Sequence, residues 1–286
     1  MIPILVTIGP FPGIGAIHVY SYGMMMALGF IAANFVVMEE CKRKNLSADF
    51  ASSLVIWAAI AGLVGGRIYD ILDNLHAYSA QATTMIFSGS GFVWYGGLIG
   101  GMLGCCLVAH RYKVPSLQMA DVAAPAAAIG QALGRVGCFL SGDGDWGTPT
   151  KLPVGVAFRN AIVGWNAHTV LSLDRNGNLV SGFYPGVKVH PAMLYETALY
   201  LIVFAVLWSL RRRVTTNGQV FYLYLLLAGA SRFFVEFVRI NPRVLGGLSE
   251  AQLIAIVMMV AGTAAWYWSY KESVLDAARP AHAGMN

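Results

Sequence analysis

Much of this chain consists of long segments built almost entirely from apolar side chains, and these segments limit the folds that it can adopt. A helix needs about 20 such residues to cross a bilayer, because each residue advances it by about 1.5 Å. Charged residues make up 12% of the chain, against roughly 25% in a soluble domain. The sequence therefore predicts an all-α membrane protein with seven transmembrane helices, at roughly 15–38, 50–72, 91–109, 119–141, 192–210, 217–238 and 249–270.

The polar stretches divide this predicted architecture into four parts. Residues 1–141 carry spans 1 to 4, and residues 191–271 carry spans 5 to 7. Between them, residues 142–190 are polar and too long for a turn, which predicts a small structured insertion outside the lipid. Residues 272–286 form a tail. The first charged residue is Glu39, so the first apolar segment is interpreted as a retained span and not as a cleaved signal peptide.

The basic residues between the predicted spans predict the orientation of the chain. Cytoplasmic connections carry an excess of Lys and Arg. Ten of these residues lie on one side of the predicted bundle, and two lie in short connections on the other side. The N-terminus and the 142–190 insertion are therefore predicted outside the membrane, and the tail in the cytoplasm. The ten are Lys42, Arg43, Lys44, Arg111, Lys113, Arg211, Arg212, Arg213, Lys271 and Arg279, and the two are Arg239 and Arg243. No basic block suggests nucleic acid as a partner.

Three arginines fall within the spans, at positions 67, 135 and 232. With this orientation each lies roughly 10 Å below the outer surface, where a charge is costly and needs a partner or a function. Other spans bring polar side chains to the same layer, namely Tyr20, Tyr22, Tyr95, Glu196 and Glu236. The layer matches the depth of lipid phosphates, and a planar guanidinium binds phosphate through two parallel hydrogen bonds. The pattern predicts a pocket for an anionic lipid headgroup in the outer leaflet.

Some of these residues also fit structural roles. The spacings of Arg67 with Asp70 and of Arg232 with Glu236 suit ion pairs on a single helix, whereas Arg135 has no acid within one turn.

Other singled-out residues have structural alternatives as well. Tyr20 fits an aromatic belt at the membrane surface. The glycines four residues apart in GGLIGGMLG (96–104) fit close helix packing. His190, beside Pro191 at the start of a span, fits a helix cap as well as a site residue. The four cysteines have no metal or disulfide spacing.

Six motifs together resemble the prolipoprotein diacylglyceryl transferase family over nearly the whole chain. They are YGMMMALGF (22–30), GGRIYD (65–70), GGLIGG (96–101), GRVGCFLSGDGDWG (134–147), HPAMLYE (190–196) and SRFFVEFVR (231–239). The resemblance implies a multi-pass enzyme of the bacterial inner membrane, in agreement with the span count and orientation. It implies transfer of the diacylglyceryl group of phosphatidylglycerol to the lipobox cysteine of a prolipoprotein signal peptide, with glycerol phosphate leaving. Its expected partners are these two substrates and membrane lipids, with no cofactor and no metal.

The resemblance and the polar layer together predict the site. The predicted catalytic residues are Tyr95, Arg135 and Arg232. The predicted substrate-binding residues are Tyr22, Arg67, Arg135, Asp143, His190, Glu196, Glu236 and Arg239. Arg135 and Arg232 would stabilise the charge that develops on the leaving phosphate.

A base must also take the proton of the acceptor thiol, whose pKa is near 8.5. Tyr95 is one candidate, provided that arginines lower the pKa of its phenol; otherwise it would hydrogen-bond the lipid. Asp143, Glu196 and His190 are the other candidates.

The sequence departs from the family pattern at several polar positions. Tyr95 stands where the family usually has His, and Ala228 where it often has Tyr. The segment Cys138–Asp143 replaces two asparagines and shortens a glutamate. Two alternatives therefore stay open. One is a paralogue that binds the same lipid with another acceptor or without catalysis. The other is a small lipid transporter, although the inverted repeats and midplane polar groups expected of a transporter are not seen in the sequence.

Overall fold

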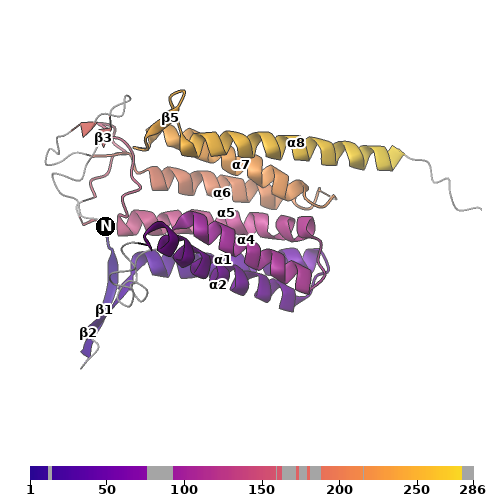
Figure 1. Ribbon diagram of the computed structural model, residues 1–286, viewed down its shortest axis with the longest axis horizontal. Helices are drawn as coiled ribbons and strands as arrows, with labels where there is room; N and C mark the ends of the chain where they lie inside the picture. Colours follow the sequence, from indigo (N-terminus) through magenta and orange to yellow (C-terminus); the bar gives the residue numbers. More distant parts are fainter. Residues whose placement is uncertain are drawn as a thin grey trace, which may run out of the picture. The chain divides into compact units, whose positions relative to one another are not determined.

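The computed structural model describes residues 1–11, 15–75, 93–158, 160–162, 172–173, 179–180, 188–214 and 216–278. These residues are mostly helical (Figure 1). The helices are α1 (Ser21–Arg43), α2 (Ala48–Asp73), α4 (Trp94–Arg111), α5 (Ser116–Ser141), α6 (Ala192–Leu210), α7 (Gln219–Val235), the 3-10 helix η1 (Glu236–Val238) and α8 (Glu250–Ala278). Each predicted span therefore has a helix.

Six of the described helices are long and apolar enough to cross a membrane, so the chain is a multi-pass membrane protein. These six are α1, α2, α5, α6, α7 together with η1, and α8 up to Lys271. The remaining predicted span, 91–109, corresponds to α4, which has 18 residues, five of them glycine. Glycine adds length without apolar side chains, and the last turn of α4 carries His110 and Arg111, so α4 is not among the six.

The described residues also contain three two-stranded antiparallel sheets, which the prediction of an all-α fold did not include. They pair β1 (Ile4–Phe11) with β2 (Gly15–Tyr20), β3 (Ser172–Leu173) with β4 (Leu179–Val180), and β5 (Arg243–Leu245) with β6 (Leu248–Ser249). The first span was predicted to begin near residue 15, but α1 begins at Ser21. The preceding segment is rich in Ile, Val and Thr, which favour extended backbone because their branched side chains restrict χ1 in a helix.

Two further predicted parts lie only partly within the described residues. The 142–190 insertion contains the described residues 142–158, 160–162, 172–173, 179–180 and 188–190, and the rest of it lies outside them. In the 272–286 tail, α8 continues to Ala278, and residues 279–286 lie outside.

The chain forms two compact units, one of residues 1–32 with 124–286 and the other of residues 33–123. In the second unit, α2 and α4 pack closely along glycines. A Cβ on Gly104 would lie 2.7 Å from the carbonyl oxygen of Trp57, and Gly65 and Gly100 approach the facing helix at least as closely. The predicted packing role of GGLIGGMLG is therefore confirmed, and such packing holds helices together where lipid removes the hydrophobic drive.

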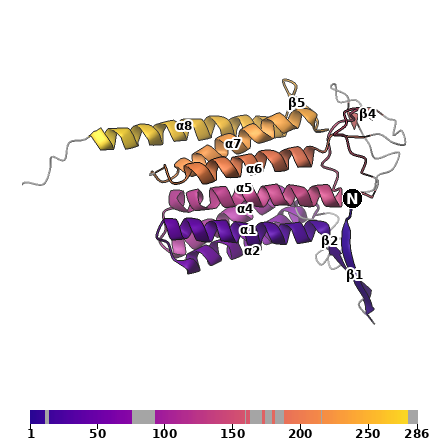
Figure 2. The same cartoon turned by 180° about the vertical axis from the view of Figure 1, so that it is seen from behind.

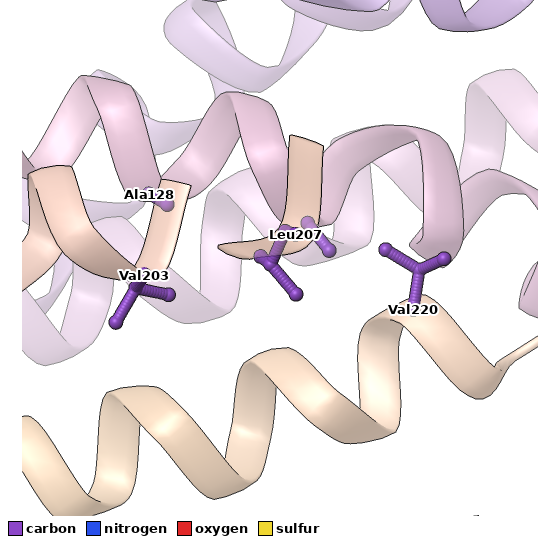
Figure 3. Close-up of a cluster of buried hydrophobic side chains, with 5 residues drawn as sticks. Ala128, Val203, Leu207 and Val220 are labelled. Carbon is purple, nitrogen blue, oxygen red and sulfur yellow. The ribbon is translucent and has the colours of Figure 1, made fainter. Parts of the chain in front are cut away.

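In the first unit, α6 packs against α7, and α7 against α8, while α5 lies beside α6 (Figure 1 and Figure 2). Figure 3 shows the apolar contact among three of them, where Ala128 of α5 faces Val203 and Leu207 of α6 and Val220 of α7. The small Ala128 side chain leaves room for the branched side chains. About two turns from this contact, α5 carries Arg135 and α6 carries Glu196.

Candidate functional site

A backbone seam draws together three segments of the first unit that are distant in sequence. The N–H of Gly147 donates to the carbonyl of His190 at 2.8 Å, and the N–H of Thr148 donates to the carbonyl of Val238 at 2.8 Å. Glycine is required at position 147, because a Cβ there would lie 2.9 Å from the Cβ of His190 and closer still to the Val238 oxygen. The loop after α5 is thereby joined to the start of α6 and the end of η1.

Glu196, on the first turns of α6, is the centre of the charged groups near this seam. Its Oε1 lies 2.5 Å from Nη1 of Arg232 and 3.2 Å from Nη1 of Arg239. Its Oε2 forms an ion pair with Nε of Arg135. The Glu196 side chain is only 2% exposed, so one buried carboxylate binds three guanidinium groups from α5, α7 and the segment after η1.

Asp145 forms a second bridge between two of the same arginines. Its Oδ1 lies 2.6 Å from Nη2 of Arg239, and its Oδ2 binds Nη1 of Arg135. Burial by itself would raise the pKa of Asp145, but Arg239 and Arg135 hold it below its usual value. Burial would likewise lower the pKa of Arg239, but Asp145 and Glu196 raise it. Both groups are therefore charged at neutral pH.

Glu236 completes the group at the C-terminal end of α7. Its Oε2 lies 2.9 Å from Nη2 of Arg232, one turn earlier, and 3.8 Å from Nε of Arg239. The ion pair predicted from the Arg232–Glu236 spacing is confirmed. The same arginine also binds Glu196, so the pair is part of a network between helices.

We name this group the arginine cluster, and it consists of Arg135, Arg232, Arg239, Asp145, Glu196 and Glu236. Three positive charges face three carboxylates, so its net charge is close to zero. The Arg135 and Arg232 side chains are 22% and 24% exposed, whereas that of Arg239 is 6% exposed. Each guanidinium has five N–H donors, so Arg135 and Arg232 can hold these carboxylates and still offer donors to an anionic ligand.

Three other predicted site residues belong to the same unit. Tyr22 of α1 packs at Gly137 of α5, where an added Cβ would lie 3.3 Å from the Tyr22 ring. Asp143 accepts a hydrogen bond from the backbone N–H of Asp145 at 3.2 Å. Burial, together with the charge of Asp145, raises the pKa of Asp143 above its usual value. His190 Nδ1 lies 3.0 Å from the hydroxyl of Tyr195 and makes no cap to α6, whose start has no side-chain capping bond.

The other two predicted site residues, Arg67 and Tyr95, belong to the unit of residues 33–123. Arg67 Nη1 lies 3.8 Å from Oδ2 of Asp70, which confirms the structural ion pair. Tyr95 is at the start of α4, and its ring makes an edge contact with Trp94. Their participation in a site with the arginine cluster stays a prediction.

Sequence reasoning did not assign Asp145 to the site, although it binds two arginines of the cluster. It lies ten residues after Arg135, beyond the reach of any helical spacing rule. Its sequence signals are its place just beyond the span that carries Arg135, which it shares with Asp143, and its position between Gly144 and Gly147, where glycines allow a tight loop.

One group of side chains has the composition of a metal site. Cys138, Asp143 and Asp145 each offer a ligand atom, and these atoms lie within 4.8 Å of one another. Both carboxylate oxygens of Asp145 bind arginines, so this ligand is already neutralised by positive charge. We therefore assign Asp145 to the arginine cluster.

Comparison with known proteins gives a consistent result. A family model described as prolipoprotein diacylglyceryl transferase matches residues 10–268. A phosphatidylglycerol–prolipoprotein diacylglyceryl transferase of Clostridium tetani is 32% identical over 86% of this chain and 91% of its own length. Its counterpart in Finegoldia magna is 32% identical over 86% of this chain and 89% of its own. The enzyme of that name in a Nostoc species is 30% identical over 94% of this chain and 89% of its own length.

Proposed function

This chain belongs to the prolipoprotein diacylglyceryl transferase family, and we propose that its arginine cluster binds the phosphate of the lipid donor. The chain is a phosphatidylglycerol–prolipoprotein diacylglyceryl transferase. Its donor in this proposal is phosphatidylglycerol, and its acceptor is the lipobox cysteine of a prolipoprotein signal peptide. The family predicted from the motifs is thus confirmed.

The reaction requires stabilisation of a growing negative charge. The acceptor sulfur forms a bond to the glycerol carbon of the diacylglyceryl group, while the bond from that carbon to the phosphate oxygen breaks. A phosphodiester with one negative charge becomes a phosphomonoester of glycerol that gains a second. Fixed positive groups beside the leaving oxygen lower the barrier, because they interact more strongly with the transition state than with the substrate.

The observation that carries the proposal is how Arg135 and Arg232 are held. Both guanidinium groups bind the buried Glu196 carboxylate, yet both side chains stay partly exposed. A guanidinium fixed in this way loses little freedom when a phosphate binds, so more of the binding energy is available for catalysis. Arg239 is much less exposed, and we propose that it supports Asp145 and Glu196 behind the lipid phosphate.

The base that takes the thiol proton is proposed to be Tyr95, with three alternatives. Glu196 suits this role poorly, because both oxygens of its carboxylate already bind arginines. Asp143 suits it better, since its pKa is raised above its usual value. His190 is the third, and its Nδ1 is within hydrogen-bond distance of Tyr195. Tyr22 and Arg67 are proposed as further substrate contacts.

The Tyr95 assignment and the activity can be tested in cells depleted of their own transferase. We expect the unchanged chain to restore lipoprotein maturation, and Tyr95→Phe to lower the rate at least tenfold, or about 1.4 kcal/mol of barrier. The Phe variant keeps the ring and removes the oxygen. Tyr95→His should stay active, because an imidazole with pKa near 6.5 suits a general base.

The readout is the fraction of a reporter lipoprotein that is modified. An unimpaired Tyr95→Phe variant would exclude Tyr95 as the base. If the unchanged chain and both variants leave the reporter unmodified yet bind phosphatidylglycerol, the proposed acceptor is wrong, and a divergent lipid-binding role takes its place.

We also propose seven spans in a bacterial inner membrane, with the N-terminus and the 142–190 insertion outside and the 272–286 tail in the cytoplasm. The asymmetry of Lys and Arg between the connections supports this orientation. A reporter fused after Lys44 should behave as cytoplasmic, and one fused within 150–185 as external. The opposite pattern would mean that the predicted orientation is wrong, and with it the common depth inferred for Arg135 and Arg232.

A further inference from the structure

The hairpin that follows η1 encloses the Glu236 carboxylate. Oε1 of Glu236 accepts hydrogen bonds from Nδ2 of Asn241 at 2.5 Å and from Oγ of Ser249 at 2.9 Å. Its Oε2 is left for Arg232, at 2.9 Å. The Glu236 side chain is fully buried. Its two oxygens therefore face different partners, neutral donors from the hairpin on one side and an arginine of the cluster on the other.

Ser249 itself is fixed by the start of α8. Its backbone N–H donates to Oε1 of Gln252 at 3.0 Å, and its Oγ accepts from the N–H of Gln252 at 3.3 Å. Arg243, at the first residue of β5, donates from Nη1 to the same Gln252 oxygen at 2.7 Å and from Nη2 to the Glu236 carbonyl at 3.3 Å. The base of the hairpin is thus a rigid support for the two donors to Glu236.

Without these donors, Glu236 would lose the orientation in which Oε2 faces Arg232. A carboxylate whose oxygen loses buried donors rotates or recruits another partner, because an unsatisfied buried charge is costly. The remaining partners are Arg232 and Arg239. A shift of Glu236 would therefore move the guanidinium that is proposed to meet the phosphate, and displacements of about 1 Å in a site can cost roughly hundredfold in rate.

We propose that Asn241 and Ser249 are positioning residues, which orient Arg232 toward the lipid phosphate by clamping Oε1 of Glu236. This inference rests on the proposed role of Arg232 and deepens it. Neither Asn241 nor Ser249 binds an arginine of the cluster in the interactions described above, so each acts through Glu236. Asn241 lies two residues before β5 and Ser249 is the last residue of β6, so the pairing of β5 with β6 brings the two donors together and gives this short sheet a function in the site.

The test measures transfer to a lipobox peptide by the purified full chain in phosphatidylglycerol nanodiscs. In Asn241→Ala we expect kcat to fall roughly tenfold, the size expected when one hydrogen bond to a charged group is lost. The KM for phosphatidylglycerol should change by less than about twofold, because the interaction strengthens in the transition state. The inhibition constant of added glycerol phosphate, the charged product, should rise by a similar factor of roughly ten.

Ser249→Ala should show the same pattern, and Ser249→Thr should restore it because the hydroxyl remains. Ser249 also caps α8, so Ser47→Ala serves as the matched control for a lost cap. Ser47 caps α2 by accepting from the N–H of Phe50 at 3.2 Å. The Ser47→Ala variant should have lower thermal stability, but its inhibition constant for glycerol phosphate should not change.

A double-variant cycle separates this inference from the function on which it rests. In an Arg232→Lys background, Asn241→Ala should have little further effect on kcat, because the residue through which it acts is already changed. If Arg232→Lys is impaired while Asn241→Ala transfers at the wild-type rate, the positioning role is wrong and the proposed site stands. If Asn241→Ala lowers kcat equally in both backgrounds, it does not act through Arg232. If Arg232→Lys itself transfers normally, the proposed role of Arg232 fails first.

Discussion

Arg135→Lys is expected to transfer the diacylglyceryl group at least roughly a hundredfold more slowly than the unchanged chain, the loss seen when a transition-state donor is removed. Arg135 binds Glu196 through Nε and Asp145 through Nη1. The single ammonium of lysine keeps the positive charge but cannot span two carboxylates and a phosphate in one plane. The measurement is the initial rate with a lipobox peptide at saturating phosphatidylglycerol.

The matched control is Arg213→Lys, which changes an exposed arginine just after α6. It removes the same planar group without touching the arginine cluster, so its rate should stay within about twofold of the unchanged chain. A rate in Arg135→Lys within about threefold of wild type would mean that positive charge alone suffices, or that the phosphate binds elsewhere.

Glu196→Gln is expected to lower stability and activity together. The substitution keeps the shape of the side chain and removes the buried negative charge that the three guanidinium groups of the arginine cluster share. Removing one partner of a buried ion pair costs roughly 3–5 kcal/mol, because the remaining charge is left uncompensated. The measurements are thermal unfolding of the detergent-solubilised protein and the transfer rate of the fraction that remains folded.

Glu40→Gln provides the comparison for this second prediction. Glu40 is also a fully buried glutamate bound to an arginine, with its Oε2 2.7 Å from Nη2 of Arg43, but it lies outside the arginine cluster. It should lower stability and leave the transfer rate of the folded fraction unchanged. Normal thermal stability in Glu196→Gln together with lost transfer would instead favour a direct chemical role for this carboxylate.

Much of the helical framework could be predicted from the sequence. The segment predicted at 192–210 is helix α6 at the same residues, because Pro191 and Arg211 mark its two ends. At the N-terminus the same reasoning failed, and β2 was taken for the beginning of a span. A short apolar run rich in branched residues has no helical period to identify it, and its pairing with β1 is set by contacts that spacing does not show.

The candidate site could be predicted at its arginines and less well at their partners. Arg135 and Arg232 stand out because a charge within an apolar span needs a reason. Asp145 and Asn241 lie in loops, and Ser249 ends the two-residue strand β6, where polar residues are ordinary and carry no signal. The Gly147 seam brings Asp145 to the arginines, and the hairpin after η1 brings Asn241 and Ser249 to Glu236. Such contacts between distant segments depend on the packing of α5, α6 and α7 and not on local pattern.

Binding of the lipid phosphate by the arginine cluster can be tested with two lipids, of which one carries a phosphate headgroup and the other lacks it. The purified chain is reconstituted in nanodiscs of a neutral lipid with equal trace amounts of phosphatidylglycerol and diacylglycerol, and the lipids that remain bound after delipidation are counted by mass spectrometry. We predict that the unchanged chain and Arg213→Ala retain phosphatidylglycerol in clear preference to diacylglycerol, and that Arg135→Ala with Arg232→Ala loses this preference. Equal preference for phosphatidylglycerol in the double variant and the unchanged chain would contradict the assignment of the phosphate to the arginine cluster.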